Sequence, residues 1–199
     1  MTFLFGVMII CAEKISSSQN TNKSFFESKA VIFDSNNNVI LKTNVLPWLM
    51  TIPNIGVEYT FKNHWSANLD VWYCPWMISE KYSVKTAAVL PEIRYWLKSN
   101  IKGSFFNLHL NVAWYNVRFN TNRYQDEGHP LMGAGIGYGY RLNFSSRCGM
   151  EFNVGFGFAY TRYNRYYNIA NGALADTRVT TYWGIDRAAI TFVYYLNSI

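Results

Sequence analysis

The amino-acid sequence predicts an all-β fold, an eight-stranded antiparallel up-and-down transmembrane β-barrel. Two observations lead to this prediction. Beyond residue 38, apolar and polar side chains alternate with period two almost throughout, which is the pattern of strands with two different faces. The connections between these strands are alternately short and long, as in outer-membrane barrels, where periplasmic turns are tight and external loops are longer.

The alternation marks eight segments, most of them near the roughly 9 to 11 residues that a tilted membrane strand needs. They are residues 39–48, 55–62, 65–74, 84–97, 105–117, a segment containing 133–144, 149–161 and 187–196. The short connections are 62–64, 98–104 and 144–147, and the long ones are 47–54, 75–83, 119–130 and 161–186. No Gly/Pro/Ser-rich linker divides the chain, so we expect one domain.

The first four segments each separate apolar from polar side chains. In chain order, the apolar face holds Val39, Leu41 and Val45; Ile55, Val57, Tyr59 and Phe61; Ala67, Leu69, Val71 and Tyr73; Val89, Ile93 and Tyr95. The opposite face holds Lys42 and Asn44; Gly56, Glu58, Thr60 and Lys62; Ser66, Asn68, Asp70 and Trp72; Glu92, Arg94 and Trp96. Each segment is therefore suited to two different environments, one on either face of the sheet.

The last four segments repeat this separation with bulkier apolar faces. These faces hold Phe106, Leu108, Leu110, Val112 and Trp114; Ile136, Tyr138, Tyr140 and Leu142; Phe152, Val154, Phe156 and Phe158; Ala188, Ile190, Phe192, Tyr194 and Leu196. Opposite them stand Asn107, His109, Asn111 and Ala113; Gly133, Gly135, Gly137 and Gly139; Glu151, Asn153, Gly155, Gly157 and Ala159; Arg187, Ala189, Thr191 and Tyr195. Tiny and polar residues thus share one face.

The bulk of the two faces decides which one points inward. The apolar face carries more aromatic and aliphatic volume than a small barrel can enclose, so we expect it to face lipid. The alternating glycines at 133–139 then relieve crowding in a narrow interior. Buried charges must pair or keep water, and both signs occur inside, so a paired ladder is feasible and a conducting pore is disfavoured. The predicted interior charges are Lys42, Glu58, Lys62, Asp70, Glu92, Arg94, His109, Arg141, Glu151 and Arg187.

The N-terminal part predicts export. Thr2 to Ala12 is an apolar run of about 11 residues, too short to span a bilayer as a helix and typical of a signal peptide. We therefore expect a signal peptide at 1–18, a periplasmic segment at 19–38 and the barrel at 39–199, in the outer membrane of a Gram-negative bacterium. Cys11 would suit a lipoprotein instead, but Ile9-Ile10 match that signal poorly. Cys74 and Cys148 can form a disulfide only if their strands meet.

Composition narrows the partners. Charged residues are 15% of the chain and aromatic residues 18%, whereas ordinary soluble domains carry about 25% charged residues. Many tyrosines and tryptophans are typical of a protein with apolar and wet interfaces. The net charge of +6 fits anionic lipid headgroups, including lipopolysaccharide, and no motif for nucleic acid, metal or cofactor stands out. We expect membrane lipid as a partner, no nucleic acid and no cofactor.

A series of motifs resembles a known family. In order, LKTNVLPWLMTIPNIGVEYTF, NHWSANLDVWYCPW, LPEIRYWL, LHLNVAWYN, GAGIGYGYRL, FNVGFGFAYTRY and DRAAITFVYYL cover about residues 40 to 196. They look like a family of small outer-membrane barrels from Bacteroides-type bacteria, catalogued as a domain of unknown function (DUF3575-like). The resemblance implies an outer-membrane location, an eight-stranded fold and a link to fimbrial or other surface proteins. It implies no catalytic residues.

Three clusters suggest chemistry, each weaker than its structural interpretation. His64-x-Ser66 resembles the His-x-Ser of lipid A deacylases, where a serine needs a base and an orienting acid. The expected short turn at His64 lies on the wrong side of the membrane for that substrate. His109 with Glu92 and Glu151 suits a proton-active cluster, although buried polar packing accounts for these residues better. The third hypothesis is a metal site formed by Asp126, Glu127 and His129 of one long loop.

The segment AYTRYNRYYN, residues 159–168, suggests a binding surface. Its basic and aromatic side chains suit lipopolysaccharide phosphates and sugars, and also an ordinary interfacial aromatic girdle. The binding candidates are Arg162, Tyr163, Arg165, Tyr166 and Tyr167. The sequence thus favours a non-enzymatic surface anchor, adhesion or envelope-assembly protein that acts through its external loops. A lipid-modifying barrel enzyme and a soluble lipocalin-like ligand-binding barrel are the alternatives.

Overall fold

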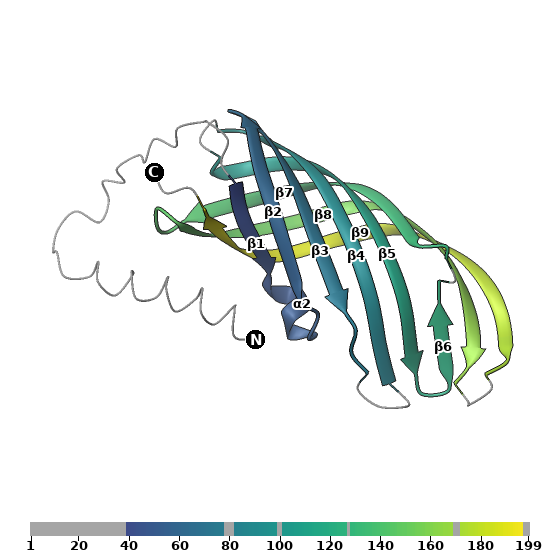
Figure 1. The fold of residues 1–199 in the computed structure, drawn as a ribbon. Helices are drawn as coiled ribbons and strands as arrows, with labels where there is room; N and C mark the ends of the chain where they lie inside the picture. Colours follow the sequence, from purple (N-terminus) through teal and green to yellow (C-terminus); the bar gives the residue numbers. More distant parts are fainter. Residues whose placement is uncertain (1–38, 78–81, 99–100, 127, 169–171, 197–199) are drawn as a thin grey trace.

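The computed structural model describes residues 39–77, 82–98, 101–126, 128–168 and 172–196. The predicted signal peptide 1–18 and periplasmic segment 19–38 lie outside these residues. One antiparallel sheet contains all the strands, which lie side by side and obliquely around a common interior (Figure 1). The strands are β1 (Val39–Asn44), β2 (Asn54–Lys62), β3 (Trp65–Cys74), β4 (Tyr82–Trp96), β5 (Gly103–Phe119), β6 (Asn122–Gln125), β7 (Leu131–Asn143), β8 (Cys148–Tyr167) and β9 (Leu174–Tyr195).

The sheet closes into a ring. Strands β1 to β5 pair in chain order, β5 pairs with β7, β7 with β8 and β8 with β9. Strand β9 then pairs with β1, with Ile40 opposite Tyr195 and Asn44 opposite Thr191. The predicted all-β antiparallel fold is therefore confirmed. The predicted number of eight strands is wrong, because the described part of the chain contains nine.

The additional strand, β6, lies in the segment expected to be a long loop at 119–130. Its four residues pair with β5 on one side and with β8 on the other, from Asn122 opposite Phe119 and Tyr167 to Gln125 opposite Asn116 and Asn164. It fills the position between β5 and β8 beyond the start of β7 at Leu131. Four residues rich in Asn, Arg and Gln show no apolar alternation, so the sequence pattern gave no sign of a strand.

The first strand is shorter than predicted. Strand β1 ends at Asn44, and Val45–Leu49 form a short helix, α2, rather than the rest of a strand to residue 48. Asn44 caps this helix, because its side-chain oxygen accepts from the Leu46 backbone amide at 3.1 Å. Pro47 in the first turn is compatible with a helix and cannot donate to a sheet ladder.

The last two strands are much longer than predicted. The expected loop 161–186 consists mostly of strand, since β8 runs to Tyr167 and β9 begins at Leu174. Short and long connections therefore alternate less strictly than the sequence suggested. A β-bulge interrupts the β8–β9 pairing: Gly155 is opposite Arg187 and Phe156 is opposite Ile185, which leaves Asp186 as the extra residue. The bulge breaks the period of two and conceals the strand.

Apolar side chains cover the outside of the ring and polar ones fill the inside. Ile136 is 68% exposed and Leu108 is 58% exposed, whereas Glu58 and His109 are fully buried. The alternation of exposed and buried residues is clearest in β2, at Asn54–Phe61. Lys62 was predicted to point inward and is instead exposed, because a bulge between Thr60 and Lys62 shifts the register with β3.

Two smaller findings complete the fold. Cys74 is a free, buried thiol whose Sγ donates to the Val84 carbonyl at 3.2 Å, so it forms no disulfide with Cys148. Within the described ranges, no helix has the length and apolar character that crossing a membrane requires.

Candidate functional site

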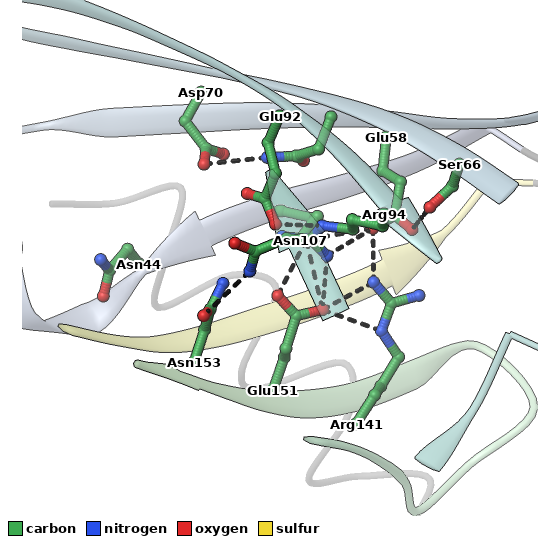
Figure 2. A network of polar contacts seen from close by, with 12 residues as sticks. Asn44, Glu58, Ser66, Asp70, Glu92, Arg94, Asn107, Arg141, Glu151 and Asn153 are labelled. Carbon is green, nitrogen blue, oxygen red and sulfur yellow. Dashed lines mark hydrogen bonds and ion pairs between the residues drawn. The ribbon is translucent and has the colours of Figure 1, made fainter. Parts of the chain in front are cut away.

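Six strands send charged side chains into the ring, where they form one cluster. Inward positions recur at every second residue of a strand, so the six strands present their charges at similar heights. The cluster consists of Lys42 (β1), Glu58 (β2), Glu92 and Arg94 (β4), Arg141 (β7), Glu151 (β8) and Arg187 (β9). We call it the ionic cluster. Figure 2 shows its two central carboxylates with Arg94 and Arg141 pointing at them from different strands.

Glu58 and Glu151 are the centre of the ionic cluster. Lys42 Nζ lies 3.0 Å from a carboxylate oxygen of each, and Arg94 Nη1 lies 3.0 Å from Glu58 Oε2 and 2.9 Å from Glu151 Oε2. Arg141 also contacts both, with Nη2 2.6 Å from Glu151 Oε2 and a closer contact to Glu58. Three cations thus share two carboxylates, and every side chain is at most 2% exposed. Such a group is stable only because each carboxylate is fully paired.

The ionic cluster continues along β4 to β9. Arg94 Nε donates to Glu92 Oε1 at 2.6 Å, and the other oxygen of Glu92 accepts from Arg187. Arg187 Nη2 reaches Asn111 Oδ1 at 3.4 Å, which connects the cluster to a second polar group. The charges therefore form a continuous ladder across the interior rather than isolated pairs.

Aromatic side chains pack inside the ring next to the ionic cluster, on the side nearest the turn between β4 and β5. Trp96 and Phe105 pack with ring centroids 4.6 Å apart, and both are fully buried. The Arg141 guanidinium lies 4.5 Å from the Trp96 ring centroid, and that of Arg94 lies 4.6 Å from the Phe105 centroid. Trp96 Nε1 donates to Ser66 Oγ, which donates to Glu58 Oε1 at 2.7 Å. The two aromatic rings thus cover the guanidinium groups of Arg94 and Arg141 and supply further contacts to them.

The second polar group is centred on His109 and Asp186. His109 Nε2 lies 2.9 Å from Asp186 Oδ2, and its Nδ1 lies 3.0 Å from Asn107 Oδ1. Asn111 Nδ2 also donates to Asp186 Oδ2, at 3.1 Å. Asp186 was assigned to a loop by the sequence analysis and is the main interior residue that it missed. Its neighbour Arg187 also faces inward, and the bulge is what allows two consecutive residues to do so.

The alternating glycines make room for this second group. A Cβ atom at Gly135 would lie 2.6 Å from both Asp186 Oδ2 and His109 Nε2, and one at Gly155 would lie 2.6 Å from His109 Cε1. At Gly137 the nearest atom is Asn107 Oδ1, also at 2.6 Å. All three distances are too short for a real side-chain carbon. Gly135 and Gly155 are therefore required by the His109–Asp186 pair that lies against them, and Gly137 is required by Asn107.

Little space remains between the two groups. A cavity of about 70 Å³ lies between Asp70, Asn111, Asp186 and Arg187, among others. Asp70 Oδ2 accepts from Asn68 Nδ2 at 2.9 Å and takes no part in the ionic cluster's ion pairs. Ligand pockets are typically about 300–1,000 Å³ and mostly apolar, so this interior has the wrong size and polarity for an apolar ligand.

The sequence analysis named ten interior charges. The structure gathers Lys42, Glu58, Glu92, Arg94, Arg141, Glu151 and Arg187 into the ionic cluster, places His109 and Asp70 apart from it, and puts Lys62 on the outside. The alternation of apolar and polar residues along the chain was sufficient to identify most of these interior charges. It was not sufficient to show which charges pair, because that depends on strand register.

The sequence-suggested chemical clusters are not assembled. His64 Nδ1 lies 2.7 Å from the Trp96 carbonyl and Ser66 Oγ donates to Glu58, so these two side chains are held by different partners. His109 is opposite Glu92 in the sheet but bonds Asp186, while Glu92 pairs with arginines. Asp126 accepts from the Tyr115 amide, Glu127 lies outside the described residues, and no group of metal-ligating side chains occurs among the described ones.

The five predicted loop candidates lie on strand β8 rather than in a loop, because β8 extends to Tyr167. Arg165 Nε pairs with Asp176 Oδ1 at 2.9 Å, and the ring of Tyr163 packs edge-on against Tyr124. Tyr166 lies 5.9 Å from the Arg123 guanidinium. Arg162 and Tyr167 are exposed. The candidates thus divide between the two faces of the sheet and do not form one surface.

Comparison with known proteins gives one result. The family model described as "Protein of unknown function (DUF3575)" matches residues 21–196. Neither the curated proteins nor the solved structures contain a match to this chain.

Proposed function

We propose, from the premise that this chain belongs to the DUF3575 family of proteins of unknown function, that it is a non-enzymatic outer-membrane β-barrel. It acts as a surface anchor, adhesion or envelope-assembly protein. It does so through the end of the ring at which the longest strands extend beyond the others. Eight of its strands cross the membrane and β6 lies beyond it. The protein is exported through a signal peptide and needs no cofactor.

The observation that carries this proposal is the distribution of side chains over the two faces of a closed ring. If the ring stood in water, Ile136, Leu108 and Phe156, each more than half exposed, would contact solvent, although charged residues are buried inside the ring. Burying an apolar atom in lipid rather than exposing it to water gains about 25 cal/mol per Å². Lipid around the ring removes the cost of the exposed belt, and the β1–β9 pairing from Ile40 to Asn44 closes the ring without a free strand edge over that stretch.

The packed interior favours an anchor over a pore or an enzyme. The ionic cluster and the Trp96–Phe105 pair occupy the interior of the ring, and the cavity beside Asp186 and Arg187 measures about 70 Å³. Ser66, the nucleophile that a deacylase would need, donates a hydrogen bond to Glu58 rather than to a histidine. The polar interior likewise does not suit the apolar ligand of a lipocalin-like barrel.

A specific observation supports docking of a protein partner at the outer end. Residues Leu174 to Trp183 of β9 pair with β8, but on their other side no strand of the described ranges pairs with them, because β1 reaches only Thr191. Unpaired strand edges recruit strands from other chains. We propose that this edge, beyond the membrane, is where a surface or fimbrial protein adds a strand.

Heat-modifiability tests the barrel. Outer-membrane fractions are run on SDS gels with and without boiling, and we expect a band that resists SDS when cold and migrates differently after boiling. An epitope inserted at Gly172 should be accessible on intact cells, whereas one inserted at Ser145, in the opposite turn, should not. Recovery in the soluble fraction without a gel shift would exclude the membrane barrel, and surface exposure of Ser145 would reverse its orientation.

A further inference from the structure

A cleft on the outside of the ring lies where the apolar belt ends. Its floor is Ala87 of β4, which is opposite Tyr73 of β3 on one side and Trp114 of β5 on the other. Neighbouring strands are about 4.7–4.9 Å apart, so the two aromatic walls stand roughly 9–10 Å from each other. Tyr73 is 61% exposed and Trp114 is 43% exposed. The cleft has a volume of about 350 Å³, enough for a sugar ring.

The outer rim of the cleft is basic and rich in amides. Lys85, two residues from Ala87 on β4, is exposed and opposite Asn116 of β5. One step further out, Arg118 of β5 is directly opposite Arg123 of β6. Arg123 is held in place by amides, since its Nε donates to Asn116 Oδ1 at 3.0 Å and its Nη2 to Gln125 Oε1 at 2.6 Å. Lys85, Asn116 and Gln125 also line the cleft.

Among the described residues, no carboxylate forms an ion pair with these cations, in contrast to other arginines at the same end. Like charges directly opposite each other in a sheet are destabilising, and Arg118 and Arg123 are such a pair. The ion pairs found among the described residues at this end use Arg165 and Arg178, which both contact Asp176. Asp126 borders the cleft, but its carboxylate accepts from the Tyr115 amide at 3.3 Å. An anion at the rim would relieve the repulsion.

The inner side of the cleft is apolar. Val71, Val89 and Val112 are opposite one another on β3, β4 and β5, two residues from Tyr73, Ala87 and Trp114 along each strand. The outer surface therefore changes within a few residues from valines, to an aromatic cleft, to a cluster of cations. This is the order in which a lipid presents acyl chains, a sugar and its phosphates.

We propose that this surface binds lipopolysaccharide, with a phosphorylated glucosamine of its lipid anchor in the cleft. The acyl chains lie against the valines, the sugar stacks between Tyr73 and Trp114, and the phosphate is held by Lys85, Arg118 and Arg123. Arginine pairs with phosphate bidentately, which suits the two opposed guanidinium groups. The inference rests on the proposed outer-membrane function, because only the outer leaflet of that membrane offers this lipid.

The occupant is a glycolipid rather than a phospholipid because of the cleft. An anionic phospholipid satisfies the cations and the valines but leaves the aromatic walls without a ring to enclose. Only a phosphorylated sugar with acyl chains uses all three parts of the surface.

The test compares two double variants of the full chain in a neutral detergent. Arg118→Gln/Arg123→Gln removes two cations that have no ion pair among the described residues, and Arg165→Gln/Arg178→Gln removes two that are paired with Asp176. Binding of purified lipopolysaccharide is measured by native mass spectrometry. We expect the first double variant to lose at least about tenfold in affinity and the second to lose less than about threefold, since each lost phosphate contact weakens an electrostatic complex. Trp114→Ala should also weaken binding, whereas Trp183→Ala, an exposed tryptophan outside the cleft, should not.

Three results would overturn the proposal: equal losses in both double variants, equal binding of dephosphorylated lipopolysaccharide, or equal competition by phosphatidylglycerol. Each variant is first run boiled and unboiled on SDS gels. An Arg118→Gln/Arg123→Gln variant that keeps the gel shift but binds as wild type contradicts this inference alone, whereas absence of the shift in the wild type contradicts the barrel itself.

Discussion

His109 and Asp186, 77 residues apart in the chain, form a buried pair inside the ring, with His109 Nε2 2.9 Å from Asp186 Oδ2. Asp186 reaches this position because it is the extra residue of the β8–β9 bulge. Asp186→Ala should destabilise the folded protein by about 1.5–3 kcal/mol, since it leaves the His109 ring and the Asn111 amide without their acceptor. Urea unfolding in detergent measures this loss. Asp176→Ala removes a carboxylate of the same strand that is only partly buried; it is the control and should have a much smaller effect.

Removing an oppositely charged pair from the ionic cluster should destabilise the protein by less than the sum of the two single removals. Arg141→Leu leaves Glu58 and Glu151 with one cation fewer and should cost about 3–5 kcal/mol. The double variant Arg141→Leu/Glu151→Leu should cost less than the sum of the two single changes, because each single change leaves a buried charge underpaired. Additive losses in the same unfolding assay would show that the two side chains are not coupled.

Gly135 should be intolerant of any side chain. Gly135→Ala places a methyl group where the structure leaves 2.6 Å to Asp186 Oδ2 and His109 Nε2, and it should cost about 1–3 kcal/mol. The neighbouring residue Ala134 points outward and is exposed, so Ala134→Val adds more volume on the outer face of the ring and should be nearly neutral. The temperature at which the SDS-resistant band disappears compares the two. A neutral Gly135→Ala would mean that the interior is looser than its contacts indicate.

The outer end of the β8–β9 hairpin should depend on pH. The hydrogen bond from Arg178, together with the positive charges of Arg165 and Arg178, holds the pKa of the Asp176 carboxyl below its usual value of 3.8. A depressed pKa means that this contact stabilises the hairpin above the usual pKa and is lost as the pH falls through the lowered one. Amide exchange in β8 and β9 should therefore be slower in wild type than in Asp176→Asn at neutral pH.

The same comparison at a pH below the lowered pKa of Asp176 should show no difference between wild type and Asp176→Asn, because both side chains are then neutral. Arg162→Gln, which removes a cation from the neighbouring strand β8 without touching Asp176, is the control for charge. A difference between wild type and Asp176→Asn that persists in acid would assign the effect to packing instead.

The period of two in the sequence was sufficient to identify most of the fold. It located the strands that have an apolar outer face and a polar inner face, since each alternate residue must suit one environment. Glu58 and Arg141 were recognised as interior residues for this reason. It failed where alternation carries no information: β6, at Asn122–Gln125, is polar on both faces, and the helix at Val45–Leu49 depends on a cap at Asn44.

The sequence by itself therefore determined the fold class, the apolar exterior and the identity of most buried charges. Only the tertiary structure decided how those charges pair, that Asp186 points inward, and that Arg118 lies against Arg123 while Arg165 is neutralised by Asp176. The physical reason is that alternation is a local property of one strand. Pairing depends on register between strands, and a single bulge, such as the one at Asp186, changes the register without changing the composition of the strand.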